Sequence, residues 1–222
     1  MINTTTIQTE LLSFKNPIQA KKMEKYMRNQ FPFLGIKTPE RRKAVKQAIR
    51  KHGFPDHHNL QVLLYNLWSL DEREYHNAAL DLLGYVKEFP EGYIEIIEDL
   101  ITTKSWWDTV DSLAVQSAGT YFRQYPNKIK AITEKWITSP NLWLNRSAII
   151  FQISYKSDTD FELLKRYIRL HSQSKEFFHQ KAIGWALREY SKTEPAAVEK
   201  FIKQEELAPL SKREGLKRIN KH

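Results

Sequence analysis

The chain has 222 residues, 41% of them hydrophobic and 27% charged, a composition typical of a globular protein with a sizeable core. It contains no cysteine, which excludes disulfides and thiolate metal sites and favours a reducing cytoplasm. Lys and Arg outnumber Asp and Glu by 35 to 26, giving a net charge of +9, and this favours a polyanionic partner, nucleic acid before an acidic membrane surface. From charge alone, a basic surface that binds no polyanion is equally open.

The first segment, residues 1–52, is polar at its start and lacks the apolar stretch of a secretory signal. It contains two predicted helices, 16–29 and 39–50, joined by residues 31–35. Because this segment fits the pattern of the later chain poorly, we interpret it as a divergent N-terminal capping unit. We expect His57 and His58, which follow this segment, to lie in a polar loop.

From residue 53 to 222, apolar residues recur at three- and four-residue spacing, which indicates helices. No convincing period-two segment with a hairpin turn occurs, so an all-α fold is predicted. No apolar run reaches the roughly 18 residues that a membrane span needs. The predicted helices are 75–86, 93–101, 110–122, 129–137, 144–153, 161–170, 178–190 and 196–202.

Four of these helices share an opening in which a polar residue precedes small or apolar ones. The polar residues are Asn77, Asp111, Arg146 and Lys181, spaced by 34, 35 and 35 positions. A helical pair repeating at this period predicts a HEAT-like α-solenoid of paired antiparallel helices with a concave basic groove. No linker divides the chain, so residues 1–222 are expected to form one domain. The four polar residues would then line up along one surface.

Trp107 lies four residues before Asp111, and Trp185 four residues after Lys181, so each pair shares a helix face. A π-surface beside a carboxylate, in a basic protein, suits a polyanion that carries a local positive charge. Trp106 points about 100° away from its neighbour and is interpreted as core. Ser105 or Asp108 is expected to cap the helix.

Each of these residues also has a structural interpretation. A Trp in an all-α protein most often packs in the core. Asp111 could form a salt bridge to Arg146 of the next repeat, which would also keep a functional carboxylate ionised and fixed. The basic residues that could contact phosphates are Arg28, Lys37, Arg41, Arg42, Lys43, Lys104, Lys156, Lys181, Arg188, Lys212, Arg213, Lys217 and Arg218.

Common catalytic motifs are absent. The seven histidines include no His-Glu-x-x-His motif, and no metal site is expected. Glycine-rich phosphate loops and Gly-x-Ser-x-Gly elbows do not occur, which argues against nucleotide hydrolysis and serine-nucleophile chemistry.

Several segments, in order, resemble the AlkD-type DNA glycosylases of the DNA alkylation repair family, which are HEAT-like repeat proteins. The resemblance extends from about Met23 to Ile219. Its landmarks are residues 26–31, 35–42, 104–112, 143–146, 174–178, 181–185, 187–190 and 206–214.

The resemblance implies hydrolysis of the N-glycosidic bond of cationic N3- or N7-alkylpurines in double-stranded DNA, without base flipping and without a metal or cofactor. The implied catalytic residues are Asp111, Trp107, Trp185 and Arg146. Tyr26, Lys104, Lys181 and Arg188 are expected to contact the substrate or DNA. A cytoplasmic monomer with no membrane or obligate protein partner is expected, and the sequence does not rank N3 against N7 adducts.

Two other classes stay open. A non-catalytic HEAT-like scaffold could bind damaged or branched DNA through the same groove, and it would tolerate loss of Asp111. A protein-interaction solenoid is the commonest use of such repeats, but the net charge of +9 and the aligned cations argue against it.

Overall fold

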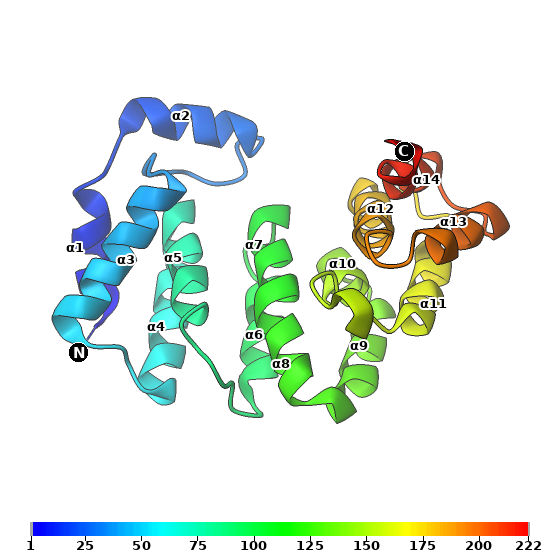
Figure 1. Ribbon diagram of the computed structural model, residues 1–222. Coiled ribbons are helices and arrows are strands. Elements are labelled where there is room, and N and C mark those ends of the chain that lie inside the picture. Colours follow the sequence, from blue (N-terminus) through cyan, green and yellow to red (C-terminus); the bar gives the residue numbers. More distant parts are fainter. Residues whose placement is uncertain (1, 222) are drawn as a thin grey trace. The chain divides into compact units, whose positions relative to one another are not determined.

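The structure, a computed structural model, describes residues 2–221 (Figure 1). Within this range the elements are helices, and no β-strand occurs, which confirms the all-α prediction. The contacts between residues divide the chain into two compact units, Met1–Pro90 and Glu91–His222. Each unit is described below by itself.

The first unit consists of five α-helices. Helix α1 packs on α3 and α4, and α5 packs on α3 and α4. Side chains of Asn3, Asn16 and Asp56 cap α1, α2 and α4 by accepting a backbone N–H of the first turn, as N-cap residues do. The helices are α1 (Thr4–Leu12), α2 (Pro17–Tyr26), α3 (Thr38–His52), α4 (His57–Ser69) and α5 (Arg73–Leu83).

The loop between α2 and α3 is held by a buried carboxylate. Glu74 on α5 accepts the backbone N–H groups of Leu34, Gly35 and Ile36 at 2.9, 2.8 and 3.0 Å. Gly35 has a φ of +86°, and a Cβ there would lie 2.0 Å from the carbonyl oxygen of Asn16. Only glycine fits this left-handed, crowded position, so Glu74 and Gly35 together fix the entry to α3.

The second unit repeats pairs of helices. Helices α7, α10, α12 and α14 contact one another in this order, and α6, α9, α11 and α13 each pack against one or more of them. Its elements are α6 (Tyr93–Thr102), α7 (Trp107–Ser112), the π-helical turn Leu113–Ala118, α8 (Gly119–Gln124), α9 (Ile129–Ile137), α10 (Leu142–Ile150), α11 (Phe161–His171), α12 (Phe177–Tyr190), α13 (Pro195–Gln204) and α14 (Pro209–Leu216), with short 3-10 turns at Pro126–Lys128, Lys156–Asp158 and Ile219–Lys221.

Polar contacts join α6, α9 and α11, the helices that precede α7, α10 and α12 in each pair. Glu98 on α6 accepts from Trp136 Nε1 at 2.7 Å and pairs with Lys135 at 3.0 Å. Glu134 on α9 in turn pairs with Arg166 on α11 at 2.6 Å. The first helix of each pair is therefore linked by polar contacts to the first helix of the next pair, as the repeat prediction requires.

Three helices were not predicted from periodicity: α1, α4 and α14. His57 and His58 open α4 rather than lying in a loop, because the Asp56 side chain accepts the N–H of Asn59 at 2.8 Å and starts the helix there. No helix within the described residues combines the length and the apolar character required to cross a bilayer.

Candidate functional site

The segment that leads into α7 has an unusual backbone. Lys104 has a positive φ of 48°, a conformation uncommon for residues other than glycine. Trp106 is the N-cap, in an extended conformation, and its carbonyl accepts the N–H of Val110 at 3.1 Å. The expected N-cap at Ser105 or Asp108 is wrong, because the Ser105 hydroxyl donates instead to the Ile101 carbonyl at the end of α6, at 2.6 Å.

Trp107 and Asp111 occupy the same face of α7. They are its first and fifth residues, which places them one turn apart, and both side chains are half-buried. The α-helix changes to a π-helical turn at Leu113. Such turns inside helices occur frequently at functional sites.

Asp111 forms a bidentate ion pair with Arg146 of α10. Arg146 Nε donates to Oδ1 at 2.7 Å and Nη2 to Oδ2 at 2.8 Å, and Nη1 donates to the Phe178 carbonyl at 2.8 Å. The Arg146 side chain is 6% exposed and that of Asp111 18%. The Arg146 guanidinium thus joins α7, α10 and the start of α12. The salt bridge between Asp111 and Arg146, which the sequence analysis predicted as the structural interpretation of Asp111, is confirmed.

The environment of Asp111 changes its acidity. Burial raises the pKa of this carboxyl above its ordinary value, and the hydrogen bonds and positive charge of Arg146 oppose that rise without cancelling it. Asp108 adds a smaller contribution that also raises the pKa. Each carboxylate oxygen has two acceptor positions, so an oxygen bonded to Arg146 can still accept from a water molecule or face a cationic ligand.

Asn145 anchors the helix that carries Arg146. Its amide nitrogen donates to the carbonyls of Trp136, Ile137 and Ser139, at 2.9, 3.1 and 2.9 Å. These carbonyls lie at the end of α9, where the helix leaves its own carbonyl groups unsatisfied. The Asn145 Oδ1 atom lies 3.2 Å from Nε2 of His179, so Asn145 also reaches α12.

His179 continues this buried network. Its Nδ1 atom lies 2.8 Å from the Ser174 hydroxyl. Burial lowers the pKa of His179 to about 4, and the charges of His171 and Arg146 contribute. The imidazole is therefore neutral near pH 7, with Nε2 donating to Asn145 and Nδ1 accepting from Ser174. This arrangement holds the neighbouring Phe178 carbonyl where Arg146 reaches it.

An aromatic cluster borders the ion pair. The ring of Trp106 lies 5.8 Å from Trp143 and 5.2 Å from Phe178, and these two rings lie 4.9 Å apart. All three side chains are half-buried. Trp106 thus packs against other rings, as its interpretation as core predicted, but it lies at the margin of the core.

Lys181 and Arg188 gather around a carboxylate that the sequence analysis missed. Glu214 of α14 lies 3.4 Å from Lys181 Nζ, 2.8 Å from Arg188 Nη1 and 3.7 Å from Lys217 Nζ. Desolvation acts to raise the pKa of Glu214, but these cations together hold it below its ordinary value. Gly184 permits this packing, since a Cβ there would lie 2.5 Å from Glu214 Cβ. Glu214 follows Lys181 by 33 residues, one or two fewer than the steps of the repeat register, so it lies close to the next register position without coinciding with it.

The remaining predicted residues are less closely joined. Trp185 lies on α12, one turn after Lys181, and is half-buried. Tyr26 ends α2 and is 73% exposed. Asn77 donates its amide N–H to the Arg73 carbonyl at 3.1 Å. Because Tyr26 and Asn77 belong to the first unit, their relation to Asp111 stays a prediction.

Comparison with known proteins decides the family. The family model described as DNA alkylation repair enzyme matches residues 7–219. The chain belongs to the DNA alkylation repair family. The expected family resemblance is confirmed over nearly the whole chain, and the chain is a DNA alkylation repair family enzyme.

Solved structures agree with this membership. A predicted DNA alkylation repair enzyme from Enterococcus faecalis is 36% identical, with a TM-score of 0.87, and the match covers 94% of this chain and 98% of that one. AlkD2 from Streptococcus mutans is 20% identical, with a TM-score of 0.59, over 78% of this chain and 85% of that one, which bears on the fold alone. No curated protein matches the chain significantly.

Proposed function

We propose that this member of the DNA alkylation repair family is a glycosylase. It hydrolyses the N-glycosidic bond of cationic N3- or N7-alkylated purines in double-stranded DNA. The observation that carries the proposal is the half-buried Asp111 carboxylate, fixed by two hydrogen bonds from Arg146 and one helical turn from Trp107. A fixed negative charge beside a π-surface suits a reaction in which positive charge develops on a sugar.

The chemistry needs no general acid. An alkylated N3 or N7 purine already carries a positive charge, so the C1′–N bond breaks with its electron pair passing to a base that leaves neutral. The sugar acquires oxocarbenium character, as in glycoside hydrolysis. A water oxygen then bonds to C1′, and the proton that this water loses passes to solvent. Asp111 stabilises the cationic sugar and orients the water.

The other residues take supporting roles. Trp107 and Trp185 place their π-faces against the sugar and backbone, where they favour a cationic centre. Arg146 positions Asp111, and Tyr26 contacts the substrate or DNA. Lys104, Lys181 and Arg188 contact phosphates. The enzyme works as a cytoplasmic monomer and engages the lesion from the backbone side, without drawing the base into a pocket and without a metal or cofactor.

The test is release of 7-methylguanine from a defined duplex under single-turnover conditions by Asp111→Asn protein. We expect a loss of at least about 100-fold, because a preorganised charge at the transition state is worth about that much. Glu98→Gln is the matched control, since it removes the carboxylate of an inter-helix ion pair in the same unit whose partners, Lys135 and Trp136 of α9, are not those of Asp111. Unchanged release by Asp111→Asn, with Glu98→Gln also unchanged, would remove Asp111 from the mechanism.

A second function is favoured by one observation. Both oxygens of Asp111 accept from Arg146, as they would in a purely structural tie between repeats. The chain would then be a HEAT-like scaffold that binds damaged or branched DNA without cleaving it. Wild-type protein that binds such DNA but releases no base would support this function.

A further inference from the structure

Helix α3 carries a row of exposed cations that the proposed site does not use. Arg42, Lys43, Lys46 and Arg50 are all exposed. With about 3.6 residues per turn, these four positions fall within an arc of about 100° on the helix surface. No acidic residue of α3 falls in this arc, because its one acidic residue, Glu40, lies outside it by the same geometry.

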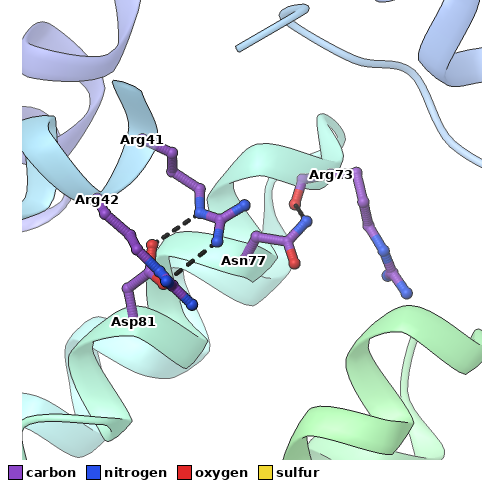
Figure 2. Close-up of polar contacts among 5 residues, drawn as sticks. All are labelled: Arg41, Arg42, Arg73, Asn77 and Asp81. Atoms are coloured by element: carbon purple, nitrogen blue, oxygen red, sulfur yellow. Dashed lines mark hydrogen bonds and ion pairs between the residues drawn. The ribbon is translucent and has the colours of Figure 1, made fainter. Parts of the chain in front are cut away.

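The charge of this row is largely unneutralised. Asp81 of α5 accepts from Arg41 through Nε at 2.7 Å and Nη2 at 3.2 Å, whereas Arg42 reaches it through Nε alone at 3.4 Å (Figure 2). The Arg42 side chain stays 67% exposed. Within residues 2–221, neither Lys46 nor Arg50 has an ion-pair partner.

Several other cations of the chain form close ion pairs with carboxylates. Lys51, on the opposite side of α3, pairs with Glu10 at 2.5 Å. On α9 and α11, Lys135 and Arg169 pair with Glu98 and Glu205 at 3.0 and 2.7 Å. The row on α3 is therefore not neutralised in the way that these cations are.

We propose that Arg42, Lys46 and Arg50 of α3 bind phosphates of duplex DNA. The proposal rests on the proposed action on DNA. Eight residues of helix separate Arg42 from Arg50, which is about 12 Å along the axis. One strand of duplex DNA advances about 3.4 Å per phosphate along the duplex axis, so the row is long enough to reach more than one phosphate of a strand.

The three side chains suit contacts that do not depend on base sequence. Asp81 orients the Arg42 guanidinium through Nε, which leaves its Nη groups to donate toward a phosphate. Lys46 and Arg50 are long, exposed side chains that can follow a backbone of variable geometry. Contacts of this kind hold a protein on the duplex and carry no sequence information.

The test compares duplex affinity of the wild type with Lys46→Ala/Arg50→Ala, by fluorescence anisotropy with an undamaged duplex across a salt series. Each lost phosphate contact lowers the slope of log affinity against log salt by about 0.9 and weakens binding several-fold. We therefore expect a slope reduced by about 1 to 2, and binding weakened on the order of tenfold at about 0.1 M salt. Lys130→Ala/Lys135→Ala on α9, with the same change in net charge, is expected to alter neither quantity by as much.

An affinity and slope equal to those of the α9 control would overturn the proposal. Single-turnover base release at saturating protein separates it from the proposed function. If the glycosylase proposal fails, the wild type releases no base, yet the loss of affinity in Lys46→Ala/Arg50→Ala still tests the α3 surface. If the α3 proposal fails, binding is unchanged while release by the wild type remains measurable.

Discussion

At the scale of single residues, the account depends on one buried ion pair. Asp111 and Arg146 are linked by two hydrogen bonds. The remaining nitrogen of the guanidinium, Nη1, donates to the Phe178 carbonyl. The 35-residue spacing predicted this pair from the sequence. The carbonyl contact was not predictable, because a backbone atom carries no signature of its own in the side-chain pattern.

Loss of Arg146 should affect both folding and catalysis. Arg146→Ala leaves a buried carboxylate unpaired, which is expected to lower the free energy of unfolding by about 3–5 kcal/mol. Arg146→Lys keeps the charge but loses the bidentate geometry, and should slow base release by about 100-fold through misplacement of Asp111. Denaturant unfolding and single-turnover release measure the two effects. Release at the wild-type rate by a folded Arg146→Lys protein would show that the geometry of the pair does not matter.

The acidity of Asp111 predicts a pH dependence. Burial raises its pKa above the ordinary value of 3.8, so the carboxylate is protonated at a higher pH than an exposed aspartate would be. Because only the carboxylate stabilises a cationic sugar, the release rate should fall on acidification at a pH above 3.8. The rate is measured against pH after subtraction of spontaneous depurination. This fall in rate on acidification should be absent from the residual activity of Asp111→Asn. If the fall persists in that variant, another group than Asp111 causes it.

The two half-buried tryptophans are expected to act in the reaction more than in folding. Trp107→Ala and Trp185→Ala should slow release by about 10-fold or more, since each removes a π-face worth about 1–2 kcal/mol to a desolvated cation. Trp106→Ala, which loses contacts with Trp143 and Phe178, should instead lower the melting temperature. If Trp107→Ala and Trp185→Ala lower only the melting temperature, they are core residues.

At the scale of elements, periodicity predicted most helices, because amphipathic helices bury one face at a spacing of 3.6 residues. Helix α9 was predicted at its observed bounds, Ile129–Ile137. The π-helical turn at Leu113–Ala118 was not predicted, since its apolar residues also fit the α-helical period. The cap at Trp106 was missed because no side chain makes it, and a backbone conformation alone leaves little trace in the sequence.

The contact between α12 and α14 supplies a stability prediction. The pKa of Glu214 is lower in the folded protein than its ordinary value of 4.5. A lowered carboxyl pKa contributes stability above the unfolded pKa, and this is lost as the pH falls through the folded value. Glu214→Gln should therefore be less stable than the wild type at pH 7, and the difference should shrink below about pH 4.5. Urea unfolding at several pH values checks this, and a difference independent of pH would contradict it.

At the scale of the whole molecule, the net charge of +9 is distributed unevenly. Cations between helical pairs of the second unit are largely matched by carboxylates, as at Glu98 and Glu134, whereas the row on α3 is not. The sequence predicted a polyanionic partner from the total charge, but which cations are neutralised depends on tertiary contacts. The contacts divide the chain into two compact units. The single domain expected from the absence of a linker stays a prediction.

The central claim is that the protein breaks an N-glycosidic bond, and incubation with methylated double-stranded DNA tests it most directly. Released bases are separated by chromatography after reaction with the wild type and with Asp111→Asn. The account predicts free 7-methylguanine or 3-methyladenine above the spontaneous level with the wild type, and far less of either base with Asp111→Asn. Wild-type protein that binds this DNA with salt-dependent affinity but releases neither base would contradict it.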